Sequence, residues 1–147
     1  MNQLRNKLDL AQVPGTMRFV PYSIGQTFTS VANNSSSATS PAVQIGPYNF
    51  VCTEIAIDMV SDSGYTTDVS AQIRDEGKSQ YFTKDNIHLN AVRDNDTHKW
   101  ILPVPWRFDA HSSIYIQVTN NDTGGVNVAT IRLIFIGYLE QPLEYKS

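Results

Sequence analysis

Apolar and polar residues alternate with a period of two in several segments of the chain after residue 16, which is the spacing of β-strands. The alternation recurs over residues 53–59, 69–73, 87–91, 114–119 and 126–138. Clusters of Gly, Pro, Asn, Asp and Ser separate these runs and predict turns. The pattern predicts about eight or nine short strands and no long helix after residue 16.

The longest predicted strand, 126–138, is apolar on both faces near its end. One face carries Ala129, Ile131, Leu133 and Phe135, and the other carries Arg132, Ile134, Ile136 and Tyr138. A strand covered on both sides fits the middle of a sandwich or a contact with another subunit. We therefore predict that Ile134, Ile136 and Tyr138 are interface residues.

The segment 100–108 carries two prolines and two tryptophans. Pro103 and Pro105 exclude a central strand and predict an edge strand or an extended connector. An extended backbone places Trp100 and Trp106 on the same face. Such a pair either anchors a core or an interface, which we favour, or stacks on sugar rings as in carbohydrate-binding modules. We count Trp106 among the candidate interface residues.

The expected architecture is all-β: a single antiparallel β-sandwich, a jelly roll, over residues 17–147, preceded by an N-terminal arm, 1–16. Its first strands are predicted at 17–22 and 26–31, separated by Ser23-Ile24-Gly25. In the arm, Leu4, Leu8 and Ala11 fall at helical spacing before Pro14-Gly15 breaks the pattern. The arm is either a frayed terminus or a docking segment. In the second case its apolar residues, Leu4, Leu8, Leu10 and Val13, require another surface.

Composition narrows the functional classes. The 147 residues suit one domain, and the formal charge of −3 with scattered basic residues argues against nucleic acid as a partner. No apolar run reaches the roughly twenty residues of a membrane span. The start of the chain has no hydrophobic segment typical of a secretory signal, so we expect synthesis in the cytoplasm. The single cysteine, Cys52, lies in an apolar run and is expected in the core.

No catalytic constellation emerges from the motifs. The three histidines, His88, His98 and His111, lie far apart without a metal-binding spacing. The run 94–98 offers clustered oxygens that resemble the opening of a calcium loop but lacks the required glycine and distal glutamate, so a plain turn is favoured. We expect no catalytic residue, no cofactor and no bound metal, and therefore a protein that is not an enzyme.

A proline-rich aromatic strand, Ile101–Asp109, is followed by the predicted strand Ser112-Ser113-Ile114-Tyr115-Ile116-Gln117-Val118-Thr119-Asn120. A further strand, Ile131-Arg132-Leu133-Ile134-Phe135-Ile136-Gly137, comes after it. With these strands the segment Ile101–Leu139 resembles small virion structural proteins of tailed bacteriophages. Some members of this group are similar to capsid decoration, or cement, proteins, which are jelly rolls on the outside of the head. Others belong to the neck or tail.

The resemblance implies a non-enzymatic decoration protein that bridges capsomers on the capsid surface of the virion. Its implied partners are the major capsid protein and other copies of the chain. The symmetry of a capsid lattice favours a homotrimer. A neck or tail component and a carbohydrate-binding module are the alternatives.

Overall fold

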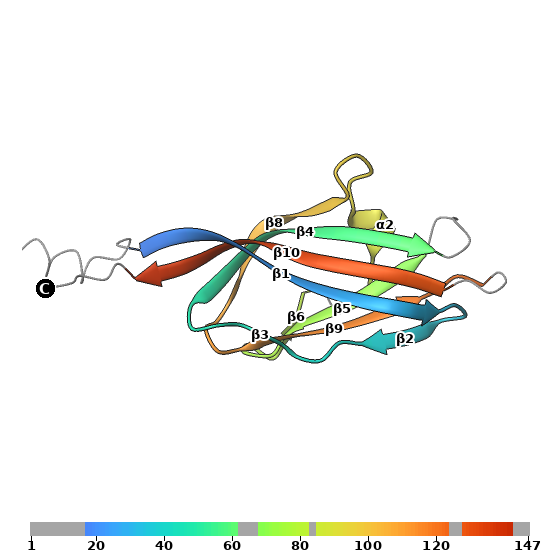
Figure 1. Cartoon of the computed structure of the whole chain (residues 1–147), viewed down its shortest axis with the longest axis horizontal. Coiled ribbons are helices and arrows are strands. Elements are labelled where there is room, and N and C mark those ends of the chain that lie inside the picture. The colour runs from blue at the N-terminus through green and yellow to red at the C-terminus, as the bar shows by residue number, and fades with distance from the viewer. Residues whose placement is uncertain (1–16, 62–67, 83–84, 124–127, 143–147) are drawn as a thin grey trace, which may run out of the picture.

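The computed structural model describes residues 17–61, 68–82, 85–123 and 128–142, which form two antiparallel β-sheets packed face to face (Figure 1). The four-stranded sheet, which we call sheet A, has the strand order β1-β10-β4-β8. Its strands are β1 (Met17–Ala32), β10 (Val128–Pro142), β4 (Asn49–Ser61) and β8 (Lys99–Phe108).

Sheet B lies opposite and has the order β2-β9-β5-β6, and it is extended because β3 pairs with β9 and β7 pairs with β5. Its strands are β2 (Ser36–Thr39), β9 (Ser113–Asn120), β5 (Val69–Asp75), β6 (Gln80–Tyr81), β3 (Val43–Gln44) and β7 (Ile87–His88). A single helical turn, α2 (Leu89–Val92), follows β7. The all-β sandwich expected from the sequence is confirmed.

The chain changes sheet at most connections, so most strands that pair are distant in sequence. The β1–β2, β3–β4, β4–β5, β7–β8, β8–β9 and β9–β10 connections all cross between the sheets. β1 pairs with β10 from Met17 opposite Pro142 to Ala32 opposite Val128. The first and last described strands therefore lie side by side along the molecule, blue and red in Figure 1.

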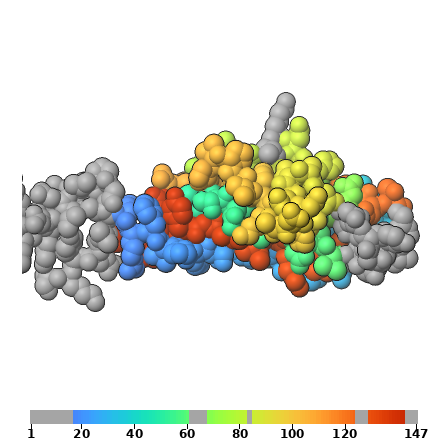
Figure 2. All heavy atoms as spheres, turned by 90° about the horizontal axis from the view of Figure 1, so that it is seen from above, coloured from blue at the N-terminus to red at the C-terminus, as the bar shows by residue number. Residues whose placement is uncertain are grey.

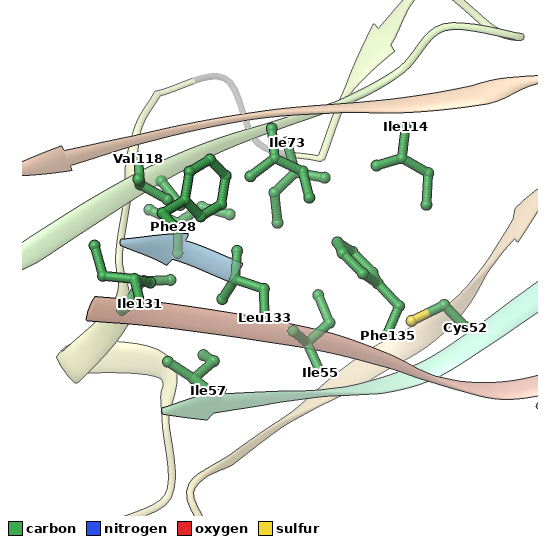
Figure 3. Packing of buried hydrophobic residues seen from close by; sticks show 14 of the residues in the cluster. Phe28, Cys52, Ile55, Ile57, Ile73, Ile114, Val118, Ile131, Leu133 and Phe135 are labelled. Atoms are coloured by element: carbon green, nitrogen blue, oxygen red, sulfur yellow. The ribbon is translucent and has the colours of Figure 1, made fainter. Parts of the chain in front are cut away.

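Apolar side chains that alternate along the strands fill the space between the sheets (Figure 3). Sheet A contributes Phe28, Ile55, Ile57, Ile131, Leu133 and Phe135, and sheet B contributes Val69, Ala71, Ile73, Ile114, Ile116 and Val118. Full burial of a side chain such as Ile or Phe contributes about 1.5–3 kcal/mol. The periods of two read from residues 69–73 and 114–119 thus mark the inner face of sheet B.

Two polar side chains are fully buried on the same inner face, one at each end of it. Asn120, opposite Val69, donates from Nδ2 to the Val31 carbonyl of β1 at 3.0 Å. Asp75, opposite Ile114, accepts at Oδ2 from the Trp106 indole N–H of β8 at 2.9 Å. Each polar side chain therefore joins sheet B to an edge strand of sheet A.

Two details of the predicted strands are wrong. Residues 17–22 and 26–31 belong to one continuous strand, because Ser23, Ile24 and Gly25 pair in register with Ile136, Phe135 and Ile134 of β10. The segment 87–91 is not one strand, since the chain turns into α2 at Leu89. In both places pairing and packing with distant residues override the local pattern.

β10 lies between β1 and β4, as its apolar faces predict, and it carries an irregularity at Gly137. The β10–β4 register shifts between Ile136 and Gly137, so that Ile136 faces Glu54 whereas Gly137 faces Cys52. A Cβ atom at Gly137 would lie 1.8 Å from the carbonyl oxygen of Val51. Only glycine permits this close approach of two backbones.

Replacing Gly137 with alanine should therefore destabilise the fold strongly. We expect Gly137→Ala to lower the free energy of unfolding by about 3 kcal/mol, because β10 or β4 must shift to relieve the overlap. Gly25→Ala is the matched control, since a Cβ there would meet Ile134 at an ordinary 3.7 Å. Chemical denaturation of both variants measures the difference, and equal stabilities would contradict the assignment.

Candidate functional site

The outer face of sheet A carries an apolar row along β10. Ile134, Ile136 and Tyr138, which we call the outer strip, point away from the buried Ile131, Leu133 and Phe135. The side chain of Ile134 is 38% exposed, and Ile136 and Tyr138 are half-buried by their neighbours. The structure thus brings together three of the predicted interface residues on one face.

Small residues flank Ile134 on both sides and Ile136 on the β1 side, and leave this part of the outer strip accessible. Ile134 lies between Gly25 of β1 and Ala56 of β4, and Ile136 lies next to Ser23. A shallow hollow of about 470 Å³ opens over Pro21, Tyr22, Ser23, Ile136 and Gly137. In Figure 2 the red atoms of β10 lie between the blue atoms of β1 and the green atoms of β4.

Charged side chains frame the outer strip and bind one another across the strands. The ion pairs are Lys99–Glu54 at 3.1 Å, Arg107–Glu140 at 2.6 Å and Arg132–Asp58 at 3.4 Å. These pairs contribute unequally to stability: the exposed Arg132–Asp58 pair contributes about 0–1 kcal/mol, and the Arg107–Glu140 pair contributes more, because Glu140 is less exposed and both of its oxygens accept from Arg107. Their effect is to leave an apolar centre with a polar rim, which is the layout of a protein-binding surface.

Trp106, the remaining predicted interface residue among the described ones, makes internal contacts. Its ring stacks on Phe82 with centroids 4.6 Å apart, and its N–H bonds to Asp75. Lys78 approaches the same Asp75 oxygen at 3.1 Å and also donates to the carbonyl of Arg107. These contacts join the β5–β6 turn to β8.

The two tryptophans share a face, as predicted, and this face is the inner one. Both Trp100 and Trp106 are half-buried and pack against the core cluster. Because Phe82 covers a face of the Trp106 ring, the contacts favour a packing role over sugar stacking. The prolines of the same segment lie on β8, which is an edge strand of sheet A, as predicted.

The run 94–98 forms a turn that the side-chain carboxylate of Asp94 stabilises. Asp94 Oδ1 accepts from the backbone N–H groups of Asp96 and Thr97 at 2.7 and 3.0 Å. These two hydrogen bonds lower the pKa of Asp94, with a smaller contribution from the positive charge of His98 when it is protonated. The oxygen that a cation would need therefore already has two donors.

Cys52 is a buried core residue, as predicted. Removal of the thiol from water raises its pKa from 9.0 to about 12, and Sγ lies 3.3 Å from the Glu54 carbonyl. A thiol with such a pKa is protonated at neutral pH and is a poor nucleophile.

Three further expectations concern metal binding, membrane-spanning segments and the N-terminal arm. Within residues 17–61, 68–82, 85–123 and 128–142, no three His, Cys, Asp or Glu side chains lie close enough to hold a metal. No helix in these ranges has the length and apolar character needed to cross a membrane. The predicted arm residues Leu4, Leu8, Leu10 and Val13 lie outside the described residues.

Comparison with known proteins identifies no family. The chain matches no protein-family model, and a search of curated proteins finds no significant match. The surface described above therefore has to be interpreted from its own chemistry.

The Trp106–Asp75 hydrogen bond should contribute measurably to stability. Trp106→Phe removes the donor to a buried carboxylate, and hydrogen bonds to charged groups contribute about 1.5–3 kcal/mol. Trp100→Phe is the matched control, because no hydrogen bond from its indole occurs among the described residues. In the Asp75→Asn background the cost of Trp106→Phe should shrink by about 1 kcal/mol. Equal costs for the two tryptophans in urea denaturation would contradict this role.

The Cys52 thiol should be inert in the folded protein. At pH 8 we expect a thiol reagent to react about a thousandfold more slowly than with the unfolded chain, following the thiolate fraction. Because the folded pKa is the higher one, this thiol favours folding below about pH 9 and loses that contribution as the pH rises toward 12. Reaction of the folded protein at the unfolded rate would contradict the burial of Cys52.

Proposed function

We propose that this chain is a non-enzymatic structural protein of a tailed-phage virion, acting as a decoration or cement protein on the outside of the head. The observation that carries the proposal is the position of the phage-like segment Ile101–Leu139. This segment supplies most of β8, all of β9 and most of β10, including the whole outer strip. The sequence that resembles virion proteins is thus also the sequence that builds the apolar surface.

Binding through the outer strip explains how such a protein would stabilise a shell. A protein that binds assembled capsomers but not separated subunits raises the free energy needed to open the shell. Apolar area provides the affinity, and the surrounding ion pairs keep the isolated chain compatible with water. In this proposal the partners are the major capsid protein and other copies of the chain, which is made in the host cytoplasm.

The strand order supports the finer part of the proposed fold. Sheet A runs β1-β10-β4-β8 and sheet B runs β2-β9-β5-β6, and most connections between successive strands cross from one sheet to the other. Eight strands arranged as two Greek keys in this manner form a jelly roll, an architecture used by viral capsid proteins. A jelly roll is therefore part of the proposal.

A neck or tail position is the second candidate within the virion. It shares the resemblance, and it differs from decoration in the number of copies that each particle carries. Quantitative gel analysis of purified particles separates the two, because a head lattice offers many equivalent sites and a neck ring offers few.

The outer strip should be required for binding to particles and dispensable for folding. We expect Tyr138→Ser to reduce occupancy on stripped and reloaded heads at least about tenfold, equivalent to the loss of about 1.4 kcal/mol. Tyr115→Ser is the matched control, because Tyr115 is 40% exposed on β9 of the opposite sheet. Absence of the chain from purified particles would overturn the proposed function, and unchanged occupancy of Tyr138→Ser would overturn the assigned surface.

A further inference from the structure

The free edge of β1 differs from the other strand edges of the described sheets. β1 has 16 residues, whereas the edge strands β2 and β6 of sheet B have four and two. The opposite edge of sheet A, β8, contains Pro103 and Pro105, which lack the N–H that a pairing strand needs. Proteins usually protect long open edges with prolines, charges or short strands.

The pattern of backbone hydrogen bonds across sheet A defines which N–H and C=O groups of β1 point outward. The N–H of Ile57 in β4 bonds to the carbonyl of His98 and therefore points away from β10. Leu133 lies opposite Ile57, so its own backbone groups point to β1, where Gln26 is its partner. Because these directions alternate along a strand, the N–H and C=O groups of the odd-numbered neighbours of Gln26 point to the open side.

Ser23, Gly25 and Thr27 accordingly present their N–H and C=O groups at the free edge, and all three residues are exposed. Pro21, which has no N–H, falls at another outward position, where a proline costs no ladder bond. The Gln26 side-chain amide donates to the Thr27 carbonyl at 3.3 Å. This long contact occupies the position that an N–H of an added strand would take.

The side chains at this edge favour a second copy of the same chain as the partner. No charged residue occurs between Arg18 and Glu54, so β1 can lie antiparallel to itself without placing like charges opposite each other. With Gly25 opposite Gly25, Ser23 faces Thr27 on both sides of a two-fold axis. In each copy, the N–H of Ser23, Gly25 and Thr27 then finds a carbonyl of the partner strand, and their C=O groups find an N–H. Pro21 lies outside the paired residues 23–27.

We propose that two copies of the chain pair through β1, antiparallel and centred on Gly25, so that their two A sheets form one continuous sheet. An interface around a two-fold axis uses the same patch on both copies, which this uncharged and symmetric stretch provides. The inference rests on the β1 edge alone and does not require the proposed virion function.

Sedimentation velocity of the full chain over a concentration series tests the pairing. We expect a concentration-dependent dimer of the 16.4 kDa chain. Ser23→Pro removes the edge N–H but no β1–β10 hydrogen bond, so it should weaken dimerisation at least tenfold while the monomer stays folded. Ser23→Ala keeps the N–H and should dimerise as the native chain does. If Ser23→Pro fails to fold by circular dichroism, Thr27→Pro tests the same edge.

Oxidative cross-linking gives an independent readout of the register. Paired Gly25 positions in a hydrogen-bonded antiparallel pair lie about 5.5 Å apart between Cα atoms, within the range of a disulfide. We expect Gly25→Cys to form a covalent dimer, and Val60→Cys, which is exposed on β4, not to do so. The buried Cys52 does not interfere.

The β1 pairing would be overturned by a monomer at every concentration or by a trimer without a dimer. It would also be overturned by a dimer that is insensitive to Ser23→Pro and Thr27→Pro, or by equal cross-linking of Gly25→Cys and Val60→Cys. None of these results affects the particle-binding test of the proposed function. Conversely, absence from particles together with a β1-paired dimer would overturn the function and retain the pairing.

Discussion

The sandwich depends on how the two sheets are held in register at the ends of their shared apolar layer. Apolar burial provides most of the stability but has no direction, so by itself it does not fix where an edge strand lies. The buried Asp75 and Asn120 supply that direction, since each makes a hydrogen bond to one edge strand of sheet A. Because an unpaired buried polar group costs more than a pair contributes, wrong alignments of the sheets are penalised.

β10 lies in the interior of sheet A because both of its faces carry apolar side chains. Its inner side chains fill the core, and its outer ones form the outer strip, so the strand is apolar on both sides. The register shift at Gly137 compensates for the extra residue on β4 and keeps Leu139 opposite the buried Phe50. Without that glycine, the close approach to Val51 would prevent β10 from pairing with β4 along its whole length.

The sequence predicts the features that depend on neighbouring residues. The period of two identifies the inner faces of β5, β9 and β10, and the two prolines place β8 at an edge. The location of Ile134, Ile136 and Tyr138 on one face follows from the same period. Their role in binding remains a prediction.

Features that depend on distant residues are not visible in the sequence. The Asp75 contact with Trp106 joins residues 31 positions apart, and no local pattern distinguishes this aspartate from one in a solvated turn. The continuity of β1 through Ser23 and Gly25 is imposed by β10, more than a hundred residues away. Pairing with a well-defined strand outweighs the weak turn signal of a single serine and glycine.

The exposed surfaces of sheet A differ in the kind of recognition that they allow. The outer strip contributes apolar area, which gives affinity with little demand on orientation. The free edge of β1 offers hydrogen-bonding groups at fixed spacing, which demand one orientation and register from a partner strand. A protein that binds a repeating surface benefits from both, since copies linked edge to edge bind the surface together and multiply weak individual affinities. The outer strip points away from the face of sheet A, whereas the edge groups of β1 point within the plane of the sheet, so the two surfaces address partners in different directions.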